Sequence, residues 1–325
     1  MKLRIAPRQR LLLQFAASVG LLAFLLSRLD WQRTVTLIRG AEPLLLAMIV
    51  MIQAADRVLM ALKWRQLLRV LDNRLGPWSA IGVYYESTFI GFALPLGGFG
   101  PDIVRFVRLR ERGLDTHVTL ASMVMERLNG VIATLALIAV GFAVLANLAP
   151  QPTLREFALV AAVVAGVAGT GAAALIFHRS FGRVLLRFEK GRFAKYVEAA
   201  RTYSTRRLTL AVNLGLSVIE QTGAVFTLWV ASHALGAPLP WMVCLAVAPV
   251  AVIIQRLPLT YGGLGLREGS AAALLVALGY DYSTALVMLM TQLAMFLISL
   301  LPGAIVLATS GRPRLDAPSD RAPAA

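Results

Sequence analysis

Two apolar stretches of the sequence are each interrupted by proline and glycine. The first covers residues 89–102 and the second covers residues 257–268. In each stretch an apolar run meets a proline, passes through closely spaced glycines and resumes as a helical pattern whose first turn carries an acid, Asp102 or Glu268. Such a break frees backbone groups that lipid cannot satisfy, so it is tolerated only against protein or a water-filled cavity. Two interrupted helices in corresponding halves of a membrane protein indicate a transporter's substrate site.

The composition supports the membrane setting that these breaks require. Hydrophobic residues make up 58% of the 325 residues, more than is usual in a soluble globular chain. A net charge of +15 would suggest nucleic acid as the partner of a soluble protein. In a membrane protein the same charges are explained by topology, and we therefore expect no nucleic-acid partner. The single cysteine, Cys244, excludes a disulfide framework. The sequence has neither a set of residues at metal-ligand spacing nor a nucleotide-binding motif, so we expect no cofactor.

Six segments are predicted to cross the bilayer. A helix needs roughly 20 apolar residues to do so, and the first of the six falls slightly short of this length. The segments are residues 11–26, 43–62, 117–148, 157–177, 208–235 and 283–309. The predicted fold class is therefore an all-α polytopic membrane protein.

The helical pattern that follows the first break is too short and too basic to cross a bilayer. It ends near Gly113 and contains four arginines. We therefore expect residues 77–113 to form a re-entrant hairpin that returns to its side of origin, and residues 239–279 to form a second one. An alternative in which each hairpin limb spans the membrane stays open, and it would place those four arginines outside.

Basic residues are distributed unevenly between the two predicted sides. By this topology 24 of the 32 Lys and Arg residues are cytoplasmic, which predicts that both termini lie inside. Residues 179–207 form a basic amphipathic segment that we expect on the cytoplasmic surface. Residues 1–311 are predicted to be one transmembrane domain, and residues 312–325 a disordered tail. Three crossings separate the hairpins, so the first would open inward and the second outward, as in an inverted pair.

Ten charged residues are predicted to lie within the membrane or in the hairpins. A charge at a helix centre costs roughly 2.5–3.5 kcal/mol on insertion scales, so these residues are candidates for a functional site or for structural ion pairs. They are Asp56, Arg57, Glu86, Asp102, Glu126, Arg127, Glu220, Arg256, Arg267 and Glu268.

Glu126 and Arg127 are neighbours in the third crossing and need separate partners. Adjacent helical residues point about 100° apart, so the two side chains do not pair with each other. The candidate partners are Asp102 or Glu268 for Arg127, and Arg105 or Arg267 for Glu126.

The restarted helices offer a place for an anion. The N-termini near Gly100 and Gly265 would present N–H groups and a positive dipole end to a phosphate, and nearby arginines would bind it in a bidentate manner. The acids would bind a cationic head group, orient the arginines or carry a proton. The predicted substrate-binding residues are Arg127, Glu126, Arg267, Glu268, Asp102, Arg105, Gly98, Gly100, Gly263 and Gly265.

The motifs in residues 258–269 and 126–130, with the glycine-rich turn before Asp102 and Arg105, closely resemble those of the lysylphosphatidylglycerol synthase transmembrane-region family, also described as flippase-like. The resemblance extends over nearly the whole chain. It implies a membrane domain that moves an aminoacylated phospholipid or another lipid-linked head group between leaflets. About fifteen residues follow the last predicted helix, so we expect a stand-alone member without an aminoacyl-transferase domain.

These expectations combine into one functional hypothesis and two alternatives. The hypothesis is a flippase or scramblase, not an enzyme, in the inner membrane of a bacterium. Its lipid would be an anionic or aminoacylated phospholipid or a polyprenyl-phosphate-linked lipid, and the sequence leaves a homo-oligomer open. One alternative is a membrane-embedded transferase or hydrolase with Glu268 or Asp102 as its base. The other is a scaffold for a lipid-synthesising partner.

Overall fold

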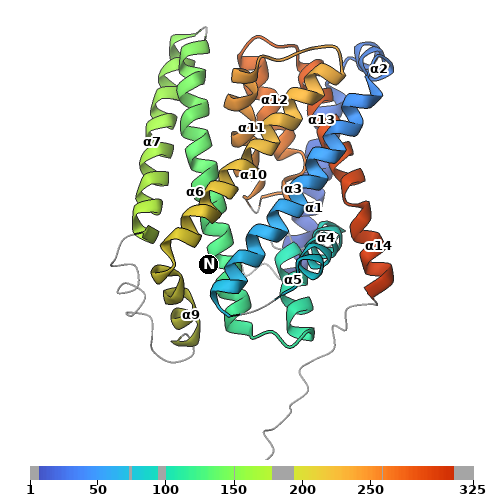
Figure 1. Ribbon diagram of the computed structural model, residues 1–325. Helices are drawn as coiled ribbons and strands as arrows, with labels where there is room; N and C mark the ends of the chain where they lie inside the picture. Colours follow the sequence, from blue (N-terminus) through green and yellow to red (C-terminus); the bar gives the residue numbers. More distant parts are fainter. Residues whose placement is uncertain are drawn as a thin grey trace, which may run out of the picture.

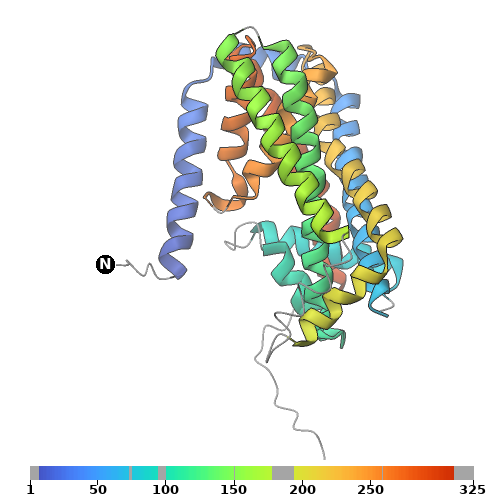
Figure 2. The same ribbon diagram turned by 90° about the vertical axis from the view of Figure 1, so that its left-hand side faces the viewer.

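The computed structural model describes residues 7–72, 75–93, 100–149, 151–177, 194–257 and 259–310, and all regular structure in these ranges is helical. Figures 1 and 2 show a bundle of long helices that run between two ends of the molecule. The long helices are α1 (Pro7–Ser27), α3 (Pro43–Val70), α6 (Thr116–Leu148), α7 (Pro152–Phe177), α10 (Arg207–Ala234) and α13 (Tyr282–Ser299), which α14 (Leu301–Ser310) extends. The predicted all-α fold class is confirmed.

The predicted number of crossings agrees with the described helices. Five of them are long and apolar enough to span a membrane: α3, α6, α7, α10, and α13 together with α14. Helix α1 becomes the sixth when it is taken with α2 (Trp31–Arg39), to which it is bent by 91°. The chain is therefore a multi-pass membrane protein. That both termini are cytoplasmic stays a prediction.

Two helical hairpins occupy opposite ends of the bundle (Figures 1 and 2). The first consists of α4 (Pro77–Ala93) and α5 (Gly100–Glu111), and the second of α11 (Trp241–Gln255) and α12 (Leu266–Ala277). A short 3-10 helix, η3 (Tyr261–Gly263), lies between the limbs of the second hairpin. These bounds match the two predicted hairpins, and their re-entry stays a prediction. The glycine-rich turn of residues 94–99, including Gly98, lies outside the described residues.

Glycines allow the limbs of the first hairpin to touch backbone to backbone. A Cβ atom on Gly91 would lie 2.2 Å from the Pro101 nitrogen, and one on Gly100 would lie 2.4 Å from the Gly91 carbonyl oxygen. Any side chain at either position would push α4 and α5 apart. Gly100 is one of the predicted substrate-binding residues; the structure places it in this packing contact, and its role in binding stays a prediction.

Tyr261 of η3 joins three parts of the chain that are distant in sequence. Its N–H donates to Ser18 Oγ on α1 at 2.7 Å, and its hydroxyl donates to the Phe92 carbonyl at the end of α4 at 2.9 Å. Its ring meets Phe15 of α1 edge to face, with centroids 6.0 Å apart. The second hairpin is thus held to α1 on one side and to the first hairpin on the other.

Helix α2 was not predicted, and it lies across the end of the bundle near the second hairpin (Figure 1). It is nine residues long and begins at the N-cap Asp30, whose side chain accepts the Arg33 N–H. Arg33 pairs with Asp281 at 3.2 Å, and the Asp30 N–H donates to Ser283 Oγ at 2.9 Å. These contacts fix the bend between α1 and α2 against the start of α13.

The predicted basic segment 179–207 contains helix α9 (Ala194–Thr205). Tyr203 anchors it, because its buried hydroxyl donates to the Leu67 carbonyl on α3 at 3.0 Å. Residues 178–193 and the predicted tail 312–325 lie outside the described residues. Their predicted positions therefore stay predictions.

Gly263 has no room for a side chain, and this gives a test of the second hairpin. Its φ is +80°, and a Cβ atom there would lie 2.7 Å from Gln255 Cα; Gly262 also has a positive φ, +59°, but nothing within 4 Å of its Cβ position. We expect Gly263→Ala to lower the free energy of unfolding in detergent by about 1–3 kcal/mol more than Gly262→Ala does. Both variants introduce backbone strain, so the difference between their unfolding free energies measures the clash of the new Cβ atom with Gln255. Equal losses would contradict this packing.

Asp281 is expected to make stability depend on pH. Burial raises its pKa, but hydrogen bonds from the Thr284 N–H and hydroxyl, together with the positive charge of the Arg33 guanidinium, outweigh this and lower the pKa below its usual value. A carboxyl group whose pKa is lowered by folding stabilises the fold at pH values above its pKa in the unfolded state, which is about 3.9. This contribution to stability is lost as the pH falls through the pKa of the folded state. The stability advantage of wild type over Asp281→Asn should therefore be full above about pH 5 and shrink below about pH 4, as measured by denaturant titration. A pH-independent advantage would contradict this assignment.

Candidate functional site

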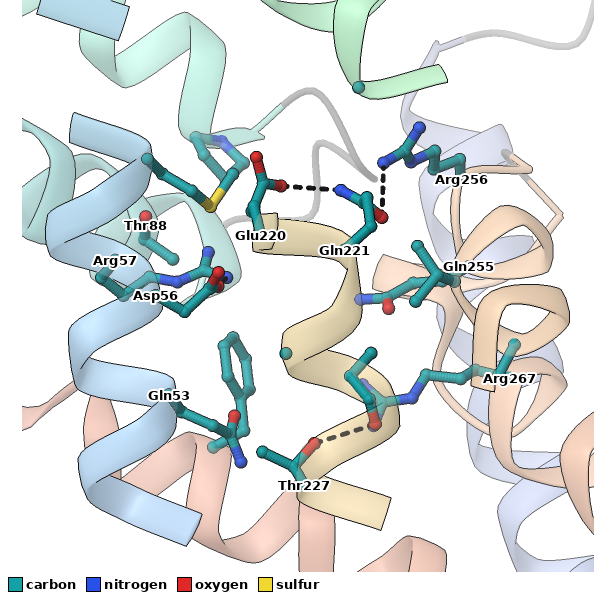
Figure 3. Close-up of a pocket in the computed structure, with 18 of the residues that line it drawn as sticks. Gln53, Asp56, Arg57, Thr88, Glu220, Gln221, Thr227, Gln255, Arg256 and Arg267 are labelled. Atoms are coloured by element: carbon teal, nitrogen blue, oxygen red, sulfur yellow. Dashed lines mark hydrogen bonds and ion pairs between the residues drawn. The ribbon is translucent and has the colours of Figure 1, made fainter. Parts of the chain in front are cut away.

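A cavity of about 480 Å³ lies between the two hairpins and the long helices α3, α6, α10 and α13. Figure 3 shows its polar lining. Asp56 and Arg57 of α3 lie on one side, Gln255, Arg256 and Arg267 of the second hairpin lie on the other, and Glu220 and Gln221 of α10 lie between them. Both interrupted stretches of the sequence thus contribute to one central cavity, because each supplies a hairpin that reaches it from its own end.

The cavity lining carries more positive than negative charge. Among the described residues, six basic and four acidic side chains line it, a formal surplus of two positive charges. The basic residues are Arg57, Lys63, Arg105, Arg127, Arg256 and Arg267, and the acidic residues are Asp56, Asp102, Glu126 and Glu220. Such a lining favours an anionic ligand, since charges in a low-dielectric environment interact strongly.

Arg105 is held firmly within the protein. Its guanidinium lies 2.8 Å from Asp102 Oδ1 and 2.8 Å from Glu126 Oε2, and it stacks 4.6 Å from the Trp64 ring centroid and 4.8 Å from that of Tyr84. The Tyr84 hydroxyl donates to the other Glu126 oxygen at 2.9 Å. Arg105 is thus one of the two predicted partners of Glu126. With two acids and two rings around it and a side chain only 4% exposed, Arg105 ties the first hairpin to α6.

Arg127 pairs with Asp102, one of its two predicted partners. The Arg127 Nε atom donates to Asp102 Oδ2 at 2.5 Å, while Asp102 Oδ1 accepts from Arg105. Asp102 therefore divides its two oxygens between an arginine of its own helix and one of α6. The Arg127 side chain is 40% exposed, so it stays accessible from the cavity.

A buried ion pair joins α3 and α10. Lys63 pairs with Glu220, and its ammonium group also donates to Ser217 Oγ at 3.0 Å. The Lys63 side chain is 1% exposed and that of Glu220 is 7% exposed. The predicted crossing ended at residue 62, so Lys63 would have lain just beyond it. The helix instead continues to Val70, and this brings Lys63 into the cavity wall.

Asp56 and Arg57 pair with each other on α3 at 2.5 Å, although adjacent helical residues point about 100° apart. The Arg57 guanidinium also lies 5.8 Å from the ring centroid of Phe296 on α13. Both had been identified from the sequence as intramembrane charges, but neither was among the predicted binding residues. The structure adds them because α3 turns this face toward the cavity (Figure 3).

Four glutamines contribute to the lining, and sequence reasoning missed all of them. They are Gln53, Gln221, Gln255 and Gln292. Gln292 donates to Thr227 Oγ1 at 2.7 Å, and Gln221 donates to Glu220 at 2.7 Å and accepts from Thr134 at 3.0 Å. An uncharged amide in an apolar run gives a weaker signal than a charge. The recurrence of glutamine within the predicted spans is the sequence signal that could have identified these residues.

Glu268 serves the second hairpin as a helix cap and is not one of the residues that line the cavity. Its carboxylate accepts the Gly265 N–H at 2.8 Å, its other oxygen lies 3.5 Å from Arg267 Nε, and the residue is fully buried. This N-terminus therefore gives one of its N–H groups to the protein's own acid. Arg267 and Gly262 line the cavity, whereas Gly100, Gly263 and Gly265 lie outside the lining set.

Among the described residues, no group of three or more His, Cys, Asp or Glu side chains is arranged to hold a metal ion. The chemistry that this lining offers is recognition of charge by guanidinium, ammonium, carboxylate and amide groups. Arginine is the side chain best suited to phosphate, because its planar fork matches two phosphate oxygens.

The model of one protein family, the lysylphosphatidylglycerol synthase TM region, matches residues 11–303. The matched range contains both hairpins and every residue that lines the cavity. A comparison with curated proteins gives no match.

The pair of Lys63 and Glu220 provides a test of the cavity wall. Glu220→Gln would leave the Lys63 ammonium buried without its acid, and we expect the free energy of unfolding to fall by about 3–5 kcal/mol. The double variant Lys63→Met, Glu220→Leu removes both charges and should recover most of that loss. Denaturant titrations in detergent would measure both. A double variant as unstable as Glu220→Gln would show that the charge left behind is not the cause.

Proposed function

The chain belongs to the lysylphosphatidylglycerol synthase transmembrane-region family, and we propose that it moves a lipid with a phosphate head group between the two leaflets of a membrane. Its family and its spanning helices make it a membrane protein related to lipid metabolism or transport. Translocation, the inner membrane of a bacterium as its location and a phospholipid or polyprenyl-phosphate-linked lipid as its substrate are the parts that we propose.

The observation that carries the proposal is the cavity between the hairpins. Its basic surplus suits an anionic head group, and its walls come from both interrupted stretches. Backbone breaks at membrane depth occur in transporters where they line a substrate site. A head group would cross through this cavity while the acyl chains remain in the surrounding lipid.

Two arginines that line the cavity support the proposal that it binds a phosphate. Arg127 lies on α6 with its side chain 40% exposed, and Arg267 lies in the first turn of α12 with its side chain 18% exposed. In the proposed mechanism both contact the phosphate. Arg105 and Glu126 keep the first hairpin in place, and Asp102 orients Arg127.

The arrangement of the hairpins suggests how access would alternate. The hairpins lie at opposite ends of the bundle, and the Tyr261 hydroxyl joins η3 to the end of α4 at 2.9 Å. Rocking of one hairpin against the other would break and remake this hydrogen bond. Such a movement would expose the cavity to one side of the membrane at a time, as in alternating-access transporters.

Translocation in proteoliposomes tests this proposal. Lipids with fluorescent head groups would be reconstituted with wild type, Arg127→Gln or Arg267→Gln, and dithionite bleaching would report arrival at the outer leaflet. We expect wild type to exceed protein-free liposomes and each variant to be slower by about tenfold or more, since a charge-assisted hydrogen bond to the phosphate is lost.

The matched control is Arg155→Gln, which removes the same charge from an exposed position in the first turn of α7. It should translocate lipid like wild type. Folded wild-type protein that moves none of the anionic, aminoacylated and zwitterionic lipids faster than protein-free liposomes would contradict the proposal. Formation of a chemically altered lipid in the same vesicles would instead favour a membrane-embedded enzyme.

A further inference from the structure

Five of the six basic side chains in the cavity lie within salt-bridge distance of an acid. The pairs are Arg57 with Asp56, Lys63 with Glu220, Arg105 with Asp102 and Glu126, Arg127 with Asp102, and Arg267 with Glu268. Arg256 is the exception: within the described ranges, no carboxylate lies close enough to form an ion pair with it. It lines the cavity as the C-cap residue of α11.

The protein holds Arg256 in place with an amide. Arg256 Nη2 donates to Gln221 Oε1 at 3.4 Å. The orientation of that amide is fixed in turn, because its nitrogen donates to Glu220 at 2.7 Å and its oxygen accepts from Thr134 at 3.0 Å. Figure 3 shows the connected series from Glu220 through Gln221 to Arg256. The series ends in a positive charge.

The Arg256 guanidinium lies next to Gly130 of α6. A Cβ atom on Gly130 would lie 3.7 Å from Arg256 Nη2 and 4.0 Å from Nη1, so the group lies beside the backbone of α6. A guanidinium has five N–H donors, and the structure gives this one a single hydrogen bond among the described residues. The remaining donors can serve a ligand.

Charge balance sets the class of that ligand. The lining has a surplus of two positive charges, and the buried Glu268 beside Arg267 offsets one of them. One uncompensated positive charge remains, at Arg256. An unpaired charge in a low-dielectric region is costly, and a bound anion of charge −1 would compensate it.

We propose that Arg256 is the specificity-determining anchor for a lipid phosphodiester, which carries a single negative charge. The inference rests on the proposed function, because it takes the ligand to be a lipid head group. A phosphomonoester at pH 7 carries a charge of about −1.5 to −2 and would exceed the surplus. The two non-bridging oxygens of a diester match the two parallel N–H groups of a guanidinium.

Direct binding to the detergent-solubilised protein tests the anchor. The probes are dihexanoylphosphatidylglycerol as the diester, dihexanoylphosphatidic acid as the monoester, and glycerophosphoglycerol as the same head group without chains. We expect wild type to bind the diester lipid more tightly than the other two. Arg256→Gln should weaken diester binding by about tenfold or more. Arg256→Lys keeps the charge but lacks the planar guanidinium, so its affinity for the diester should lie between those of wild type and Arg256→Gln.

Three comparisons complete the test. Arg155→Gln should bind the diester lipid like wild type, and thermal unfolding curves would establish that the Arg256 variants are folded. Arg256→Lys, which preserves the charge, keeps the test valid if Arg256→Gln fails to fold. Unchanged diester binding by folded Arg256→Gln would overturn the anchor. Tighter binding of the monoester would overturn the charge assignment, and equally tight binding of glycerophosphoglycerol would overturn a lipid as the ligand.

Translocation measured on the same proteins separates this inference from the proposed function. Lipid movement by wild type that Arg256→Gln leaves unchanged would overturn the anchor and leave the proposed function standing. Diester binding that depends on Arg256, without lipid movement by wild type, would support the anchor and contradict translocation.

Discussion

The two ion pairs of Asp102 are the interaction on which the arrangement of the first hairpin depends. One carboxylate joins Arg105 of its own helix to Arg127 of α6, and Arg105 continues to Glu126 one residue away. Without these contacts Arg105, which is buried on α5, would face no acid. Because the acid lies in the first turn of α5, its pair with Arg127 fixes the start of that helix against a spanning helix.

The long helices could be predicted from the sequence because each is a continuous apolar run, and the hairpins because proline and glycine interrupt theirs. Helix α2 could not, since it has nine residues and owes its position to contacts with residues far along the chain, such as Asp281. The end of α3 was placed too early. Lys63 resembled an interfacial charge, and its partner Glu220 lies 157 residues further along the chain.

The candidate site was predictable as a set of charges but not as a network. Charged residues in apolar runs stand out, and the pairs of Arg127 with Asp102 and of Glu126 with Arg105 were among the alternatives that the sequence allowed. The sequence could not assign Glu268 to a helix cap, because both a cap and a ligand contact require an acid at that position. Nor could it separate Arg256 from the paired arginines, since the distinction depends on distances between helices.

The attachment of α1 has a consequence for how the protein meets the lipid around it. Helix α1 packs on η3 and α12, through contacts such as the bond from Tyr261 to Ser18 and the approach of Gly265 to Leu21. It is therefore a lipid-facing extension of the second hairpin, although 243 residues separate Ser18 from Tyr261. If that hairpin tilts, the first helix tilts with it, and the surface that the protein presents to the acyl chains changes along the whole of α1.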